Sequence, residues 1–347
     1  MLAAALASAA LPRCWVELSR ARGCGLAGDD RRGAPADASA GRRAALGLAA
    51  GTMLGLAPEV VAGATVENAF SSVGNLGESI VLSNGMAFPK ASFGPQVYGF
   101  FGDSKARELT RAAIQVGFRN FFASVLARNQ RGFAQGIQDS NISRKEIFVC
   151  GSVDTRGVKG FDKAYQDTKK GCDENLQAFA VGGIDYVDMI MLDYPAADCE
   201  SIKGQWKAFE EMLASGKARS LAVSNFNLRQ LDCILSDPSL TPPTVNQLRF
   251  NVEAYDAATT KAVVEENRKR GIIVQAWSPL RVNGPKRDVA EKIGKAYGKS
   301  FAQVLLRWIV QSGATYTTQS SRADRLAENA NIFDFQLSEE EMQRLSA

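Results

Sequence analysis

The clearest candidate for chemistry is Asp193, which ends a nearly continuous apolar run in residues 185–195 (DYVDMIMLDYP). The run is too short to span a membrane, and apolar residues on both of its faces are typical of a strand buried in a parallel sheet. In an α/β barrel, the residue at the carboxyl end of such a strand faces the active-site mouth. Asp193 is therefore the first side chain to consider for acid–base chemistry.

Few other residues offer acid–base, nucleophilic or metal chemistry. The chain has no histidine, which excludes a histidine base, metal ligand or pH switch. Two alternatives would explain this absence: drift of composition, or adaptation to a compartment of changing pH. The cysteines, at positions 14, 24, 150, 172, 199 and 233, show no CxxC pair and no zinc-ligand spacing. Cys150 lies in an apolar strand pattern and is interpreted as a small core residue. The redox state of the cysteines is left open.

The elements that would position Asp193 alternate regularly from residue 79 onward. Asn84-Gly85 predicts a β-hairpin between strands at 79–83 and 87–88. Further strands are expected at 89–94, 118–122, 146–151, 185–192, 218–224, 244–248, 271–276 and 315–318. Helices are expected at 104–116, with Ser104 as N-cap, and at 127–140, 161–180, 201–215, 227–235, 259–270, 287–297, 300–313, 322–331 and 338–345, the last with a Ser338/Glu341 capping box.

Alternating strand–helix units imply a parallel sheet, and eight of them predict a single closed (β/α)8 TIM barrel preceded by the N-terminal hairpin. An open doubly wound sheet is the alternative, but the glycine-rich GxGxxG that it would carry after its first strand is absent. No linker divides the region, so residues 79–347 are predicted to form one domain.

Residues 1–64 have the pattern of a targeting presequence. An opening rich in Ala, Arg and Gly is followed by Arg42-Arg43, an uncharged apolar segment at 44–57, and Ala62-Gly63-Ala64, which together are typical of a twin-arginine export signal. Because this signal lies well inside the chain, we predict a plastid transit peptide followed by a thylakoid signal, a linker at 65–78, and a location in the thylakoid lumen.

The charge and hydropathy patterns limit the partners. The apolar segment at 44–57 is too short for a comfortable membrane span, so a retained anchor is the less favoured alternative, and no transmembrane span is expected in the mature chain. The net charge is +4, and the chain after residue 64 is almost balanced. It therefore lacks the electrostatic footprint of a protein that binds nucleic acid.

Nine short motifs in order carry a resemblance to a known family. They occur at 84–85 with 89, 117–119, 185–188, 206–210 with 216–217, 223–226, 245–247, 277–280, 302–304 with 307–308, and 328–329 with 333–335. With them, the chain from about residue 79 to its C-terminus resembles the aldo-keto reductase family. The resemblance implies reduction of carbonyl compounds by NADPH, with a Tyr proton donor, a Lys that lowers its pKa, an Asp that holds the Lys, and a His that orients the substrate.

All four of those catalytic positions are replaced in this chain. By their flanking motifs, the Asp position is Phe122, the Tyr position Ala127, the Lys position Ser152 and the His position Asp193. Phe and Ala donate no proton and Ser152 carries no charge, and loss of a general acid alone lowers rates about 10²–10⁴-fold. Tyr98 and Tyr194, in loops near the expected barrel mouth, are the two candidates for a relocated donor.

The resemblance leaves more of a cofactor site. The retained positions implied to bind NADP are Ser224, Asn225, Gln247, Trp277, Ser278, Leu280, Ser320, Arg325, Glu328 and Asn329. Gln319 replaces a Lys that grips the 2′-phosphate, and Gly94-Pro95 replaces a Gly-Thr pair, so weak or vestigial NADP binding is expected. The same residues would also persist as packing of the barrel rim.

Three hypotheses follow. The favoured one is a non-catalytic protein of the thylakoid lumen that serves as a structural or assembly subunit on the lumenal face of a photosynthetic membrane complex. The second is an NADP(H)-dependent oxidoreductase of carbonyl substrates with a relocated proton donor. The third is a sensor that binds NADP without chemistry.

Overall fold

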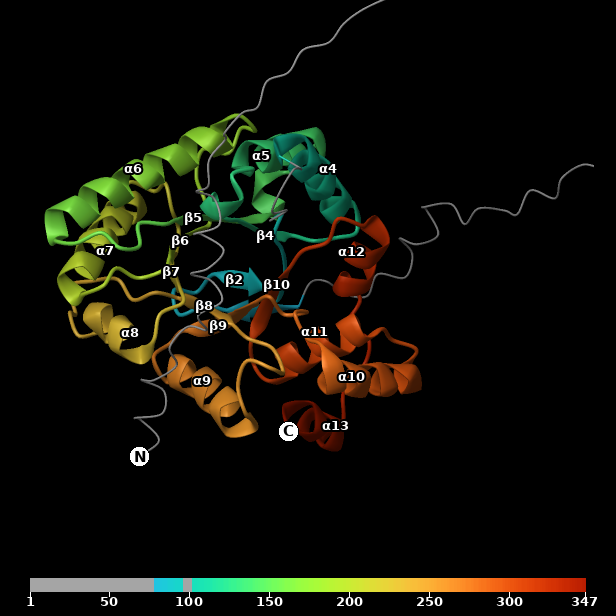
Figure 1. Cartoon of the computed structure of the whole chain (residues 1–347). Helices are drawn as coiled ribbons and strands as arrows, with labels where there is room; N and C mark the ends of the chain where they lie inside the picture. Colours follow the sequence, from blue (N-terminus) through green and yellow to red (C-terminus); the bar gives the residue numbers. More distant parts are fainter. Residues whose placement is uncertain (1–77, 96–101) are drawn as a thin grey trace, which may run out of the picture. The chain divides into compact units, whose positions relative to one another are not determined.

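Eight parallel strands form a closed barrel in the computed structural model, which describes residues 78–95 and 102–347 (Figure 1). Around the barrel the order is β10-β3-β4-β5-β6-β7-β8-β9, and a separate antiparallel hairpin of β1 and β2 precedes it. The strands are β1 (Ser79–Val81), β2 (Ala87–Pro89), β3 (Ala91–Phe93), β4 (Asn120–Ala123), β5 (Phe148–Val153), β6 (Met189–Asp193), β7 (Leu221–Ser224), β8 (Val245–Arg249), β9 (Ile273–Trp277) and β10 (Thr315–Thr318). The predicted (β/α)8 barrel and its hairpin are confirmed.

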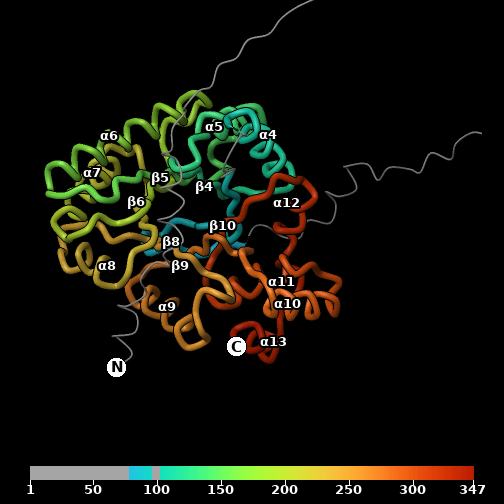
Figure 2. The backbone as a smooth tube through the Cα atoms, in the orientation of Figure 1, coloured from blue at the N-terminus to red at the C-terminus, as the bar shows by residue number. Residues whose placement is uncertain are grey.

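Helices cover the outside of the barrel, and the chain winds around it in sequence order until α12 lies beside α4 (Figure 2). The helices are α4 (Gly102–Gln115), α5 (Gln130–Asp139), α6 (Phe161–Ala180), α7 (Cys199–Ala214), α8 (Leu228–Leu235), α9 (Ala257–Lys269), α10 (Gly284–Tyr297), α11 (Phe301–Gln311), α12 (Ala323–Ala330) and α13 (Glu339–Ser346), with short 3-10 turns η1 (Val125–Ala127) and η2 (Arg144–Glu146). The predicted Ser338/Glu341 capping box begins α13.

Most element bounds differ from the predicted ranges by a few residues, and the differences at α4, α5 and β6 change the place of a predicted residue. The helix expected from residue 104 begins at Gly102, so Ser104 lies inside α4 and is not its N-cap. The helix expected at 127–140 is divided into η1 and α5, because Arg128 adopts a left-handed backbone conformation between them. Strand β6 begins at Met189, because Val187 makes only an isolated bridge and the Asp188 carboxylate accepts a hydrogen bond from the Val149 N–H.

Alternation along the strands separates two apolar cores. Outward side chains such as Ile190 and Leu192 pack under the helices, whereas Met189 and Met191 face the barrel lumen. The hairpin contributes Phe88 to the lumenal core, where its ring packs edge-on against Phe148 at 5.1 Å. Phe148 is the first residue of β5, so the hairpin closes the amino-terminal end of the barrel and leaves the carboxyl-terminal end as its mouth.

A disulfide joins Cys199, the first residue of α7, to Cys233 in α8, with a Cα–Cα distance of 5.2 Å. Cys150 and Cys172 are buried free thiols. Cys150 lies in the lumenal core, as its sequence pattern predicts, and burial raises the pKa of its thiol well above the ordinary value. Among the described residues, Cys199 is thus an exposed disulfide partner, and Cys150 and Cys172 are thiols suited to packing rather than nucleophilic chemistry.

Cys233→Ser is expected to lower the free energy of unfolding by about 2–4 kcal/mol, because the cross-link restricts the unfolded chain over a sequence separation of 34 residues. Denaturant titration with and without a thiol reductant measures the effect. The reductant should destabilise the wild type and leave the Cys199→Ser/Cys233→Ser double variant unchanged. Equal destabilisation of both proteins would contradict a stabilising disulfide.

In residues 78–95 and 102–347, no helix is long and apolar enough to cross a membrane. The predicted presequence, nearly all of the predicted linker, and Tyr98 lie outside the described residues.

Candidate active site

A layer of polar side chains crosses the lumenal faces of four neighbouring strands, at the carboxyl ends of β6 and β7 and in the middle of β8 and β9. Asp193 of β6 pairs in register with Ser224 of β7, Ser224 with Gln247 of β8, and Gln247 with Gln275 of β9. Register partners in a parallel sheet face the same side, and Met191, two residues before Asp193, belongs to the lumenal core. Asp193 thus faces the barrel mouth, as its place at the end of a buried strand predicts.

The replaced catalytic positions also meet at this end of the barrel. Phe122 and Ser152 occupy the lumenal faces of β4 and β5, and Ala127 ends the turn η1. The Val125 N–H donates to Ser152 Oγ at 3.1 Å, so a neutral hydroxyl holds the turn that carries Ala127. The structure therefore brings the four positions together, but Phe122, Ala127 and Ser152 supply neither a proton donor nor a cation.

Asp193 is the exception, because burial changes its chemistry. Its side chain is buried, and Ser124 Oγ donates to Asp193 Oδ2 at 3.3 Å. Burial, and then the charge of Asp154, raise the Asp193 pKa to about 6, while Arg156 and the hydroxyls of Ser224 and Ser124 oppose the shift. A carboxyl with this pKa carries a proton in part of the molecules near neutral pH and can deliver it to a substrate oxygen.

The residue pattern implies no proton donor at the Asp193 position, but the raised pKa makes Asp193 a candidate acid. The shift depends on burial and on Asp154, which lies in the loop after β5 and is far from Asp193 in the sequence. The only sequence signal was the carboxylate at the end of an apolar run, which does not by itself predict a raised pKa.

Tyr194 does not have the surroundings of an activated phenol. Burial and the neighbouring Asp193 raise its pKa. The Arg156 guanidinium lies 3.7 Å from the centre of its ring, and Arg156 also forms a bidentate ion pair with Asp154. The ring of Tyr194 is therefore a stacking surface for Arg156, and Asp193 is better placed as an acid.

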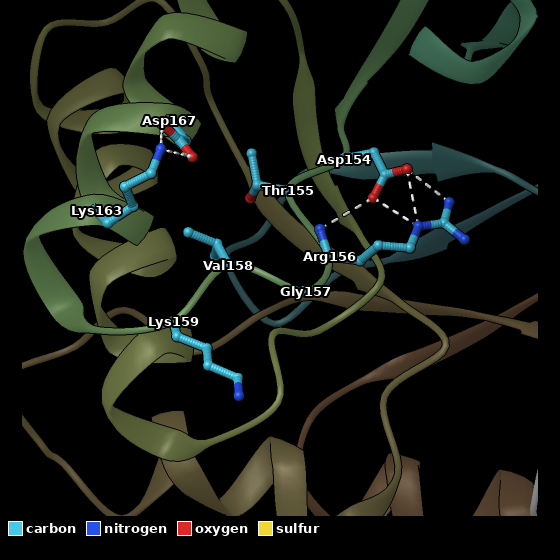
Figure 3. Close-up of a pocket in the computed structure, with 8 residues that line it drawn as sticks. All are labelled: Asp154, Thr155, Arg156, Gly157, Val158, Lys159, Lys163 and Asp167. Carbon is cyan, nitrogen blue, oxygen red and sulfur yellow. Dashed lines mark hydrogen bonds and ion pairs between the residues drawn. The ribbon is translucent and has the colours of Figure 1, made fainter.

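A cavity of about 580 Å³ adjoins this group, in the loop between β5 and α6. Asp154 and Arg156 line one side of it, and the Lys163–Asp167 ion pair lines the other (Figure 3). The Asp154–Arg156 pair therefore contributes both to the cavity wall and to the electrostatic surroundings of Asp193.

The resemblance implies that Ser224, Asn225, Gln247 and Trp277 hold the nicotinamide, and hydrogen bonds link three of them, Ser224, Asn225 and Trp277. Asn225 Nδ2 donates to Ser224 Oγ at 2.9 Å, and Trp277 Nε1 donates to Asn225 Oδ1 at 3.0 Å. Gln247 Nε2 donates to Gln275 Oε1 at 2.8 Å. The indole of Trp277 is thus held against Asn225, which in turn contacts Ser224.

Backbone strain is concentrated at the same place. Tyr194, Asn225 and Ser278 have φ values of 89°, 63° and 51°, and each directly follows the last residue of a barrel strand. Asn225 N still donates to Gln247 O, and Asn251 Nδ2 donates to Ser278 O, so neighbouring groups hold these conformations. Strain of this kind is characteristic of ligand-binding sites, which supports a retained site at the mouth.

The implied adenosine end of the cofactor site fits less completely. Ser320 lies between β10 and α12, while Arg325, Glu328 and Asn329 lie on α12. Asn329 Nδ2 donates to Thr318 Oγ1 and Ser320 Oγ accepts from Arg322 N, so both have structural partners. Arg325 is exposed, and Leu280 is a half-buried residue of the loop after β9. The nicotinamide end therefore fits the cofactor better than the phosphate end.

The family is shown by comparison with known proteins. The residue pattern of the Aldo/keto reductase family matches residues 90–284 and 280–347. The chain belongs to the aldo/keto reductase family. It is 33% identical over 275 residues to the glyoxal reductase of Bacillus subtilis, covering 79% of this chain and 93% of that protein. It is 31% identical over 280 residues to the morphine 6-dehydrogenase of Pseudomonas putida, covering 77% of this chain and 89% of that protein.

Solved structures agree with this assignment. An aldo-keto reductase from a deep-sea metagenome library of the Medee basin superposes with a TM-score of 0.68 at 25% identity, over 78% of this chain and 94% of that one. The aldo-keto reductase of Bombyx mori in complex with NADP superposes with a TM-score of 0.66 at 23% identity, over 78% and 92%. At 23% identity, the likeness to the Bombyx mori structure shows the fold alone.

Proposed function

We propose that this aldo/keto reductase family member is an NADP(H)-dependent oxidoreductase of carbonyl compounds in which Asp193 is the proton donor. The observation that carries the proposal is the buried Asp193 carboxyl, with a pKa of about 6, in the lumenal layer that also holds Ser224 and Gln247. A carbonyl oxygen next to a nicotinamide held by Trp277 would lie at this layer.

Each residue then has a defined task. Bound NADPH would supply the hydride. Ser224, Asn225, Gln247 and Trp277 would bind and orient its nicotinamide end, and the polar layer would hold the carbonyl group over it. The Asp193 O–H donates its proton to the carbonyl oxygen, and the carboxylate that remains is stabilised by Ser124 and by the nearby Arg156 before solvent restores the proton.

The relatives support the reaction class. Glyoxal reductase and morphine 6-dehydrogenase are both named as oxidoreductases, and the family match covers the whole barrel. Glyoxal, a small dialdehyde, is accordingly the first substrate to test. This reading departs from the favoured sequence-based hypothesis of a non-catalytic protein, because that hypothesis assumed that no proton donor remained.

NADPH is expected to change the tryptophan fluorescence of the body from residue 65 onward, since Trp277 would contact the nicotinamide. NADPH consumption with glyoxal and a panel of other aldehydes is expected above the rate without protein. Fluorescence titration and loss of NADPH absorbance measure the two steps. Binding without turnover on the whole panel would instead support an NADP sensor, and a flat titration would contradict both readings.

A non-catalytic role is the second candidate, favoured by the replacement of three catalytic positions with Phe122, Ala127 and Ser152. In that case the barrel would serve as a subunit at the lumenal face of a photosynthetic membrane complex. Cross-linking in isolated thylakoids followed by purification tests this role, and recovery of the protein free of any complex would argue against it.

For either function we propose the thylakoid lumen as the location. The Cys199–Cys233 disulfide supports an oxidising compartment, because such bonds are rare where cellular thiols are kept reduced. Plastid import followed by fractionation tests the location. Recovery of the processed protein in the stroma would refute it.

A further inference from the structure

One cation at the barrel mouth has no role in the function proposed above. Arg249 is the last residue of β8, two positions after Gln247 and four after Val245, which belongs to the lumenal core. Alternation therefore places Arg249 on the lumenal face, one step nearer the mouth than Gln247. Its register partner on β9 is Trp277, the aromatic residue implied to contact nicotinamide.

The guanidinium of Arg249 has a buried hydrogen-bond donor that lacks an acceptor among the described residues. Its Nε is buried and has no hydrogen-bond partner among the described residues, and no carboxylate of residues 78–95 or 102–347 forms an ion pair with it. Residues 96–101 contain no acidic side chain in their sequence. Arg144 Nε is also unpartnered, but other nitrogens of Arg144 bond Asp188 and two backbone carbonyls.

An unpaired Nε defines the kind of ligand. The Nε–H and one Nη–H of a guanidinium form a planar pair of donors that matches two oxygens of a carboxylate or phosphate. Enclosing such a donor without a partner is unfavourable, and an oxyanion that binds there removes the penalty. A side chain that remains half-buried in this part of the mouth can still be reached from solvent.

We propose that Arg249 is an oxyanion-binding residue of the barrel mouth. Two sources share this chemistry: a carboxylate on the substrate, close to its reacting carbonyl, and the pyrophosphate of the dinucleotide, which the resemblance places near Ser278 and Leu280, directly after Trp277. Binding of a substrate carboxylate rests on the proposed function, whereas binding of the pyrophosphate requires only that the protein binds NADP(H).

Arg249→Gln and Arg249→Lys separate the two sources. The first arm measures NADPH dissociation by tryptophan fluorescence. The second measures the affinity of glyoxylate for NADP-saturated protein by calorimetry, together with the KM ratio of glyoxylate to glyoxal, which differ by a carboxylate in place of an aldehyde. The exposed Arg229→Gln in α8 is the matched control for loss of one positive charge.

We expect Arg249→Gln to weaken binding by about 10- to 100-fold in one of the two arms, since a charge-assisted hydrogen bond is lost. Arg249→Lys should recover part of it, and Arg229→Gln should change neither arm. Weaker NADPH identifies the pyrophosphate as the ligand, and weaker glyoxylate with unchanged NADPH identifies a substrate carboxylate. Unchanged affinities in both arms, in a variant with wild-type circular dichroism, would overturn the proposal.

The calorimetric arm keeps this test separate from the proposed function. If no carbonyl compound is reduced but Arg249→Gln still weakens NADPH or glyoxylate, the oxyanion site stands and the oxidoreductase proposal fails. If turnover occurs and neither affinity changes, the reverse conclusion holds.

Discussion

Asp193→Asn is expected to lower kcat for carbonyl reduction by about 10²–10⁴-fold while NADPH affinity changes little. Asparagine keeps the shape of the side chain and an oxygen that can accept from Ser124 Oγ, but it has no proton of suitable acidity to donate. Steady-state and single-turnover kinetics with the best aldehyde measure the effect. An unchanged single-turnover rate would show that the proton comes from elsewhere.

The pH dependence of the wild type provides a second measurement for the same residue. Reduction requires the protonated carboxyl, so kcat should be highest below pH 6 and fall as the pH rises through the Asp193 pKa of about 6. Asp193→Asn should flatten this part of the profile. Tyr194→Phe is the matched control at the adjacent position, and we expect it to retain most of the activity and the pH dependence.

In Asp193→Asn, stability should move in the opposite direction to activity. Because the pKa of Asp193 is raised by folding, the native state binds more protons than the unfolded state between the two pKa values. The contribution of the group is therefore most favourable below its unfolded pKa and is lost as the pH rises through about 6. At neutral pH, Asp193→Asn is expected to raise the free energy of unfolding by up to about 3 kcal/mol. A destabilised variant would contradict the proposed burial penalty.

Asp188→Ala is expected to destabilise the barrel by about 3–5 kcal/mol, with a fall in melting temperature on the order of 10 °C. Asp188 is buried and lies 2.6 Å from Arg144 Nη2 and 3.7 Å from Arg219 Nη1, and it accepts from the Val149 N–H at 2.9 Å. Both arginines also stack on Tyr186, at 4.0 and 3.9 Å from its ring centre. Removing the carboxylate leaves Arg144 largely enclosed without its counter-charge.

Asp167→Ala provides the comparison for Asp188→Ala, because Asp167 pairs with Lys163 at 2.7 Å on the exposed face of α6. A surface pair of this kind contributes about 0–1 kcal/mol. The loss of stability, measured by thermal and denaturant unfolding, should therefore be several-fold larger for Asp188→Ala than for Asp167→Ala. Equal effects would mean that the cluster around Asp188 is no more important than an exposed ion pair.

Much of the fold follows from local patterns. The apolar run that ends at Asp193 and the alternation of strands with helices predicted the barrel, and the bounds of α6 and β10 agree with the expected ranges. The errors are local as well. Ser104 is a favourable N-cap, but the helix can begin earlier, and the start of β6 depended on how Asp188 is used by its neighbours.

The order of motifs along the chain was enough to locate Phe122, Ala127, Ser152 and Asp193, because each flanking motif is contiguous in sequence. It was also enough to find Ser224, Asn225 and Trp277. Whether those polar groups bind one another, as Trp277 and Asn225 do, depends on strand ends that meet only in the closed barrel.

The sequence by itself determined which residues stand at the carboxyl ends of the strands, since strand period and motif order are properties of neighbouring residues. The tertiary structure decided what those residues can do. The pKa of Asp193 depends on burial and on Asp154, the disulfide depends on the packing of α7 against α8, and the unpaired Nε of Arg249 depends on which groups close around it. Dielectric surroundings and distances between remote residues are set by packing, and no local pattern encodes them.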